Sequence, residues 1–154
     1  MILGAELGCQ AVWDEISIMI YTHPAYAASH DLAFDAYCMQ HPEKYGRSAK
    51  SYAAHLTRLC CGIEYQADPG VYAIIRQWLD GKVPLEKPAL LRERGQLTVL
   101  EVYAASDAAE FRQRVQAWAE NVWQAYHEQQ ALARQWIELA SLLYGQNRVS
   151  SRRR

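Results

Sequence analysis

The sequence predicts an all-α fold, a single bundle of five to seven helices. Apolar residues repeat with the helical period along almost the whole chain, the breaks fall at prolines and glycines, and no segment alternates as a half-buried strand would. A chain of 154 residues can bury a core without help from a metal or disulfides. We expect residues 1–147 to form one helical domain and residues 148–154 to form a basic, disordered tail.

The first predicted helix covers residues 8–22, where four large apolar residues share one stripe. They are Val12, Ile16, Met19 and Ile20. A second helix is predicted over residues 24–41, because Pro24 is tolerated in a first turn and Pro42 opposes continuation. This second helix carries most of the polar residues discussed below.

Ser48 is expected to cap a third helix that runs to Gln66. Four large residues of this helix should face inward, namely Tyr52, Leu56, Leu59 and Ile63. After the Asp-Pro-Gly break at residues 68–70, a short fourth helix should end at Gly81. The third and fourth helices therefore follow the second with only short connections.

The stretch GKVPLEKPALLRERG is predicted to be an ordered surface connection, because it combines prolines, glycines and charges. Thr98 or a neighbour should then cap a brief helix, VLEVYAA. Asp107 with Glu110 matches a capping box, and the apolar period continues from there to Leu143. A helix of that length is unusual in a small domain, so we expect a bend near residues 126–129.

Composition excludes several classes of protein. Sixteen Lys and Arg against seventeen Asp and Glu give a formal net charge of -1, which is no strong signal for nucleic acid. The four cysteines lack CxxC spacing and are expected to be reduced and buried, which favours a cytoplasmic location. No apolar run approaches the roughly 18 residues of a transmembrane helix, so no membrane partner is predicted.

Familiar catalytic motifs are also absent. The segment HEQQA begins like a zincin helix, but Ala131 stands where the second histidine would be needed. Paired Glu-x-x-His motifs, phosphate-binding glycine loops and the GxSxG elbow do not occur. Whether the protein is an enzyme therefore stays open at the level of sequence.

One segment, SHDLAFDAYCMQHP, concentrates groups that could do chemistry. On a helix, His30, Tyr37 and His41 would fall within about 40° of one another, whereas Asp35 would point to the side. If the second and third helices form an antiparallel hairpin, His55 lies at about the same height along the helices as the residues just before Tyr37. His30 and His41 would lie about 16 Å apart along the axis, so His55 would pair with only one of them.

We therefore predict a polar pocket lined by His30, Asp35, Tyr37, Gln40, His41 and His55. Its ligand would be a small polar molecule or a divalent transition metal, since imidazole is a common metal ligand near neutral pH.

The predicted metal ligands are His41, His55 and His30. Glu120 and His127, seven residues apart on one predicted helix face, are additional candidates.

Asp35 would orient an imidazole or pair with Arg47 or Arg58.

The runs HDLAFDAYCMQHP, AAHLTRLC, LTVLEVYAA and VQAWAENVWQAY resemble an uncharacterised bacterial family of small proteins, classed as a domain of unknown function (DUF5946). The similarity covers about residues 9–137. Its most specific part is the spacing of His30, Asp35, Tyr37, Gln40, His41 and Pro42, followed by His55. The resemblance implies a shared helical fold and a shared polar signature, without an activity.

Two hypotheses of function follow. The first is a binding protein, or an enzyme, that uses the predicted pocket. The alternative is a non-catalytic helical interaction protein, which would form a homo-oligomer or bind a protein partner and use its histidines as internal hydrogen-bonding groups. Ten tyrosines and five tryptophans against two phenylalanines suit either hypothesis, because aromatic rings with a polar tip occur in pockets and interfaces alike.

Overall fold

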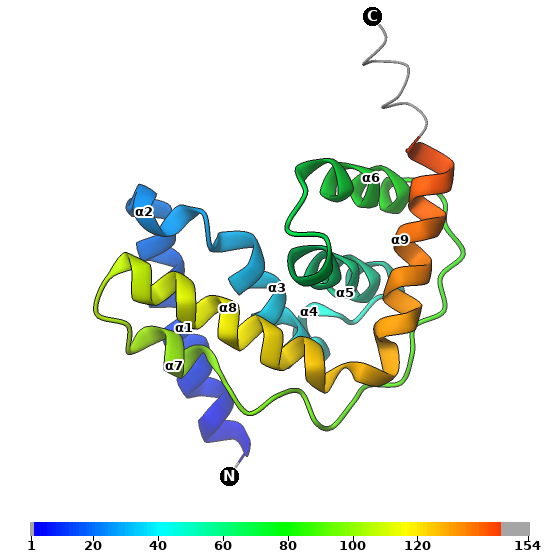
Figure 1. The fold of residues 1–154 in the computed structure, drawn as a ribbon. Helices are drawn as coiled ribbons and strands as arrows, with labels where there is room; N and C mark the ends of the chain where they lie inside the picture. The colour runs from blue at the N-terminus through cyan, green and yellow to red at the C-terminus, as the bar shows by residue number, and fades with distance from the viewer. Residues whose placement is uncertain (1, 146–154) are drawn as a thin grey trace, which may run out of the picture.

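The computed structural model describes residues 2–145, and these residues form helices and connections without any strand (Figure 1). The predicted all-α class is therefore confirmed. Six helices in this part of the chain have eleven or more residues: α1 (Ile2–Thr22), α3 (His30–Gln40), α5 (Ala49–Glu64), α6 (Pro69–Asp80), α8 (Ala108–Ala125) and α9 (Gln130–Tyr144). Three short ones join them: α2 (Pro24–Ala27), α4 (Pro42–Tyr45) and α7 (Val99–Tyr103).

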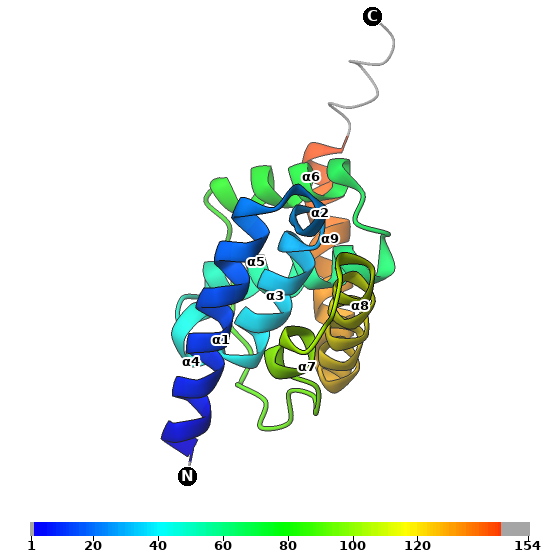
Figure 2. The same ribbon diagram turned by 90° about the vertical axis from the view of Figure 1, so that its left-hand side faces the viewer.

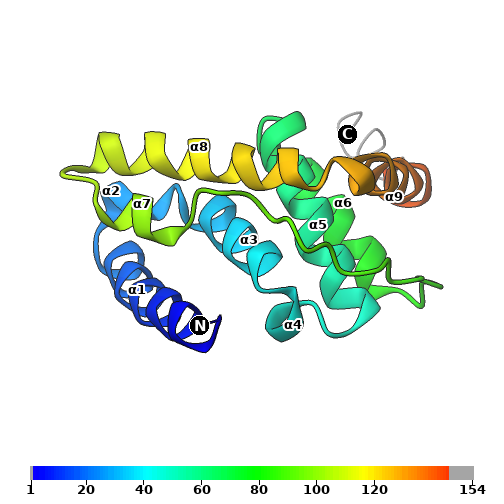
Figure 3. The same cartoon turned by 90° about the horizontal axis from the view of Figure 1, so that it is seen from below.

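Helix α5 lies at the centre of the bundle, where it packs against α3, α6, α8 and α9. Helices α1, α2 and α7 gather at one end, and α6 and α9 at the other (Figure 1). Figure 2 shows α1 on the outer side of α3, and Figure 3 shows α8 running along the molecule from α2 and α7 toward α9. Helices α3, α5 and α8 thus connect the two ends and surround the region where the site lies.

Local capping explains where several helices begin. The Ser48 hydroxyl accepts a hydrogen bond from the Ser51 amide at 3.0 Å, and Asp68 accepts one from the Gly70 amide at 2.7 Å. Thr98 forms a complete capping box with Glu101. These bonds satisfy amide groups that a helix start leaves without partners. The predicted starts of the third helix and of the brief helix at Thr98 are therefore confirmed.

The start of α8 differs in detail from the predicted capping box. The Asp107 carboxylate accepts from the Glu110 amide at 2.8 Å, as expected. The Glu110 carboxylate, however, accepts from the amide and hydroxyl of Ser106, one residue before the cap. The reciprocal bond of the box therefore reaches one residue farther back than the prediction placed it.

The predicted second helix is wrong as a single element. It is divided into α2 and α3 by a turn at Ala28 and Ser29, where the Ser29 amide bonds to the carbonyl of Tyr26, three residues back. At Ser29 the backbone has ψ of -1°, away from regular helical geometry, which interrupts the helix without any proline. The first helix also begins at Ile2, earlier than predicted.

The predicted bend near residues 126–129 is confirmed as a break between α8 and α9. The Tyr126 amide bonds to the carbonyls of Val122 and Trp123, and a 3-10 turn at His127–Gln129 follows. The buried Tyr126 hydroxyl donates to the carbonyl of Met39 on α3. This turn lets α9 leave the direction of α8 and pack on α5 and α6 (Figure 1).

The connection between α6 and α7 is ordered, as predicted, because amide side chains hold its backbone. Gln40 donates to the carbonyls of Arg94 and Leu97 at 3.1 and 2.7 Å. The side-chain oxygen of Asn121 accepts from the amides of Gln96 and Leu97 at 2.8 and 2.9 Å. These bonds give partners to backbone groups that no regular element satisfies.

Three further sequence predictions concern the cysteines, membrane-spanning helices and the C-terminal tail. None of the four cysteines, all of which are among the described residues, forms a disulfide, and Cys38, Cys60 and Cys61 are buried. Within residues 2–145, no helix combines the length and the apolar character needed to cross a bilayer. The predicted basic tail, residues 148–154, lies outside the described residues.

Candidate ligand-binding site

Asp35 on α3 is the most deeply buried charged residue of the predicted site, with a solvent-exposed fraction of 0%. Its carboxylate oxygens contact two partners on α5: Nδ1 of His55 lies 3.0 Å from Oδ1, and Nε of Arg58 donates to Oδ2 at 3.2 Å. His55 thus meets α3 at the level that the hairpin prediction gave. Asp35 pairs with Arg58, one of its two predicted cationic partners.

Burial raises the pKa of the Asp35 carboxyl, while the hydrogen bond from His55 and the charge of Arg58 act in the opposite direction. The two α5 partners therefore compensate for only part of the effect of burial, and the pKa of Asp35 stays above its usual value. The contact of 3.0 Å between Nδ1 of His55 and the Asp35 carboxylate fixes one side of the ring, so Asp35 orients this imidazole.

His30 belongs to a separate set of contacts. Its Nδ1 lies 3.2 Å from the Asp31 carboxylate, and its Nε2 shares a hydrogen bond of 3.2 Å with the Tyr21 hydroxyl. The Phe34 ring stacks against His30 at a centroid distance of 5.8 Å and meets His55 edge-on at 5.4 Å. The two imidazoles therefore flank one apolar ring, and their polar partners differ.

Tyr37 faces α1, and His41 contacts the Tyr37 ring. Their ring centroids are 4.5 Å apart, and Tyr37 also stacks on Trp13 at 4.8 Å. The Tyr37 hydroxyl donates to the side-chain oxygen of Gln10 at 3.2 Å. Burial raises the pKa of Tyr37, which keeps its hydroxyl protonated as a donor. The structure therefore divides these residues into three sets: Tyr37 with His41, His30 with its own partners, and the Asp35 group, which consists of Asp35, His55 and Arg58.

The remaining predicted residues lie elsewhere. Gln40 accepts a hydrogen bond from the Trp118 indole at 2.9 Å, in addition to its bonds to the connection between α6 and α7. Glu120 is exposed and accepts from Gln116 at 2.8 Å. His127 has an exposed side-chain fraction of 72%. The shared face of Glu120 and His127 was wrongly predicted, because α8 ends at Ala125.

No group of three or more His, Cys, Asp or Glu side chains that could hold a metal ion occurs in the described part of the chain. His41, His55 and His30 are not brought together there as one ligand set. The prediction of a metal therefore gains no preassembled site from the structure.

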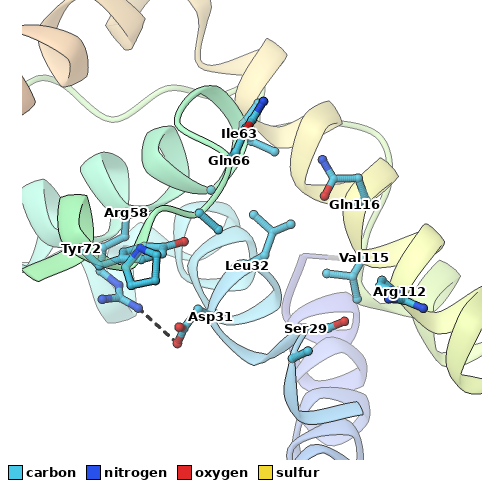
Figure 4. A pocket seen from close by; sticks show the side chains of 14 residues that line it. Ser29, Asp31, Leu32, Arg58, Ile63, Gln66, Tyr72, Arg112, Val115 and Gln116 are labelled. Atoms are coloured by element: carbon cyan, nitrogen blue, oxygen red, sulfur yellow. Dashed lines mark ion pairs between the residues drawn. The ribbon is translucent and has the colours of Figure 1, made fainter. Parts of the chain in front are cut away.

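A cleft with a volume of about 710 Å³ opens beside the Asp35 group (Figure 4). It lies between α3, the end of α5 with its turn into α6, and α8; we call it the α3–α8 cleft. Its main lining residues are Asp31, Leu32, Arg58, Ile63, Arg112 and Val115. Leu32, Ile63 and Val115 supply apolar surface between polar groups contributed by different helices (Figure 4). The volume falls in the range typical of small-molecule sites.

Arg58 forms the fixed polar wall of the α3–α8 cleft. Besides its bond to Asp35, its Nη2 lies 3.2 Å from the Asp31 carboxylate, and its guanidinium lies 4.8 Å from the centre of the Tyr72 ring. Two carboxylates and a cation–π contact therefore hold one side chain in place. The wall comes from three elements, α3, α5 and α6.

Close packing beside the cleft depends on a glycine of α5. A Cβ atom at Gly62 would lie 2.7 Å from Cδ1 of Leu32 and 3.3 Å from the Tyr72 hydroxyl. A larger residue at position 62 would therefore require the Leu32 side chain to shift. At the rim, Gln66 and Ala67 have φ of 53° and 54°, where the chain turns out of α5. The turn at the rim therefore has an uncommon backbone conformation for residues other than glycine.

Sequence reasoning missed the cleft and two of its residues, Tyr72 and Arg112. A partial signal existed, because Asp31 and Asp35 are four residues apart on α3 and oppose Arg58 on the next long helix. Arg112, by contrast, has the sequence pattern of an ordinary charged residue on a solvated helix face. Only the packing of α8 against α3 places it at the cleft.

Fold and site define this chain as an all-α protein with an open polar cleft between three helices. It belongs to the Family of unknown function (DUF5946), whose model matches residues 2–127. This match confirms the resemblance drawn from the sequence, and it includes all of α3, α5 and α8. No curated protein and no solved structure matches the chain.

Proposed function

We propose that this protein binds a small organic molecule in the α3–α8 cleft. The observation that carries the proposal is the combination of a volume of about 710 Å³ with a polar wall already fixed before any ligand arrives. Arg58 is held by Asp31, Asp35 and Tyr72, so a ligand would not need to order this side chain. Preorganisation of this kind lowers the entropic cost of binding.

The predicted residues Asp35 and His55 have a positioning role in this proposal. Asp35 is fully buried behind Arg58, and His55 contacts Asp35 from the same helix as Arg58. They would act on a ligand through the orientation of the guanidinium. The ligand site thus lies beside the predicted polar pocket, on the α8 side of α3.

Nuclear magnetic resonance on the 15N-labelled full chain tests the proposal, with hexan-1-ol as an uncharged probe. We expect concentration-dependent shifts of amide signals in α3, α5 and α8. A tryptophan at Ile63, which is half-buried and lines the cleft, should fill the space and suppress these shifts. Leu142→Trp, at an exposed position of α9 outside the cleft lining, is the matched control and should leave them unchanged.

The spectrum without ligand shows whether each variant remains folded. Shifts that map to another surface, or that persist unchanged in folded Ile63→Trp, would count against the α3–α8 cleft as the binding site.

One observation favours the interaction protein as a second candidate. Helices α1 and α7 pack together, and each exposes two large apolar side chains. These are Ile18 and Tyr21 on α1 and Leu100 and Tyr103 on α7, with exposed fractions from 51% to 76%. Contiguous exposed apolar surface marks interaction sites, and the contact between α1 and α7 brings these two pairs onto neighbouring helices. A second copy of the chain is the partner to test, because the homo-oligomer was the alternative considered from the sequence.

Sedimentation equilibrium tests the second candidate. If copies associate through α1 and α7, the wild type should show a concentration-dependent dimer, and Ile18→Glu should shift it toward monomer. Leu142→Glu, at an exposed position on α9, is the control. A wild type that stays monomeric at all concentrations, or an Ile18→Glu variant that still dimerises, would reject this surface.

A further inference from the structure

We infer that the ligand of the α3–α8 cleft carries an anionic head, a carboxylate or a phosphate, which binds between Ser29 and Arg112. The inference rests on the proposed function and adds the chemical class of the ligand. Two observations, one on charge and one on an unused hydroxyl, support it independently.

The charges at the two sides of the cleft differ. Arg58 is paired with Asp31 and Asp35, so its positive charge is balanced within the protein. Arg112 lines the same cleft from α8, and no acidic partner is recorded for it among the described residues. The positive charge available to a ligand is therefore concentrated at Arg112. Guanidinium groups bind carboxylate and phosphate oxygens through charge-assisted hydrogen bonds.

Ser29 supplies a second donor at the same side. Its exposed fraction is only 7%, and it lines the cleft at the N-cap position of α3. Its hydroxyl makes no capping bond, and no other partner is recorded for it in the described part of the chain. Figure 4 shows the hydroxyl on the same side of the cleft as Arg112. A hydroxyl that belongs to a mostly buried residue, lines the cleft and has no protein partner is well suited to hydrogen-bond a ligand oxygen.

The surface next to this donor pair is apolar. Leu32 and Val115 lie between the Arg112 side and the Arg58 wall (Figure 4). A ligand with one anionic head and a short apolar body would match both parts of the lining. Asp31, at the opposite wall, disfavours a second anionic group there.

Three probes with the same six-carbon body test the inference: hexanoate, hexyl phosphate and hexan-1-ol. In amide-shift titrations of the full chain, we expect at least one anion to bind roughly tenfold more tightly than the alcohol. Arg112→Gln should remove this preference while keeping the affinity for hexan-1-ol. Ser29→Ala should reduce it. Arg92→Gln, on the exposed connection, is the matched control and should keep the preference for the anion over the alcohol. The tighter of the two anions identifies the head group.

The result separates the two proposals. Equal affinities for the alcohol and both anions, or a preference that survives in Arg112→Gln, would overturn the anionic head and leave cleft binding intact. Failure of all three probes to shift cleft signals would overturn both. Because Arg112 is exposed, Arg112→Gln should fold normally, and its spectrum without ligand verifies this.

Discussion

Asp35 links the packing of α3 on α5 to the wall of the α3–α8 cleft. The carboxylate is inaccessible to solvent, and its only recorded side-chain partners in the described chain are His55 and Arg58. Removing one partner of a buried charged group costs more than the pair itself contributes, because the remaining group is left without compensation. Residues around Asp35 should therefore be sensitive to substitution even though they touch no ligand.

His55→Ala is the direct test at this scale. We expect the free energy of unfolding to fall by about 1 to 3 kcal/mol, because Asp35 loses one of its hydrogen bonds. Urea unfolding followed by circular dichroism measures the change.

His127→Ala is the matched control, since this histidine is exposed and should change stability by less than about 0.5 kcal/mol. Equal stabilities of wild type and His55→Ala would show that the bond to Asp35 contributes nothing.

Part of this residue-scale picture could be predicted from the sequence. The hairpin geometry gave the level at which His55 meets α3, and Arg58 was one of two foreseen partners of Asp35. The periodicity directed His55 toward His30 or His41, however, and its contact with Asp35 comes from the structure. The separation of Tyr37 and His41 from that group could not be foreseen, because it depends on Trp13 and other groups of α1. Gln40 likewise gains its structural role from partners that lie far away in sequence, such as Trp118.

At the scale of elements, capping residues correctly predicted helix starts where all the groups involved are neighbours in the sequence. Capping by Ser48 and Thr98 involves residues within three positions of the cap, so the sequence contains all the participants. The division of the predicted second helix could not be foreseen in this way. Neither proline nor glycine marks the turn at Ser29, so no residue in the sequence signals the change in ψ that interrupts the helix there.

The start of α8 makes a prediction about pH. Hydrogen bonds from Ser106, followed by those from Arg114, lower the pKa of Glu110 from 4.5 to about 2. The folded chain thus holds this proton less tightly than the unfolded chain. The stabilisation from Glu110 is therefore present above pH 4.5 and is lost as the pH falls toward about 2.

We expect Glu110→Gln to have a lower thermal midpoint than the wild type near neutral pH. The two midpoints should converge as the pH falls through this window. Differential scanning fluorimetry across the pH series measures the difference, with the exposed Glu120→Gln as control. A midpoint difference that stays constant down to acidic pH would contradict the assignment.

The connection between α6 and α7 yields a second prediction for elements. Asn121→Ala removes the acceptor of the Gln96 and Leu97 amides. Hydrogen exchange at these two amides should become roughly three- to tenfold faster, in line with the loss of one ordinary hydrogen bond. Gln124→Ala, on an exposed face of the same helix, is the control. Unchanged exchange at both amides would mean that Asn121 does not hold the connection.

At the scale of the whole molecule, the α3–α8 cleft combines residues that are far apart in the chain. Asp31, Arg58 and Arg112 come from three helices, and no local pattern relates them. The all-α class was predictable because periodicity is repeated in every segment. The cleft was not, because it follows from the relative placement of α3, α5 and α8, which local periodicity and capping signals do not reveal.

The assignment of residues 1–147 to one domain stays a prediction with a calorimetric test. Heating the full chain should give a single transition whose calorimetric and van't Hoff enthalpies agree, because α8 contacts α2 and α7 at one end of the bundle and also α5, which packs on α6 and α9 at the other end. Two resolved transitions, or a calorimetric enthalpy well above the van't Hoff value, would indicate independently unfolding parts.

The most direct measurement of the central claim is the position of a bound probe. Isotope-filtered nuclear Overhauser effects between hexan-1-ol and the 13C-labelled chain report which methyl groups the probe touches. Cleft binding predicts effects at the methyl groups of Leu32, Ile63 and Val115. Effects confined to the exposed side chains of Ile18 and Leu100, with none at the three cleft residues, would contradict it.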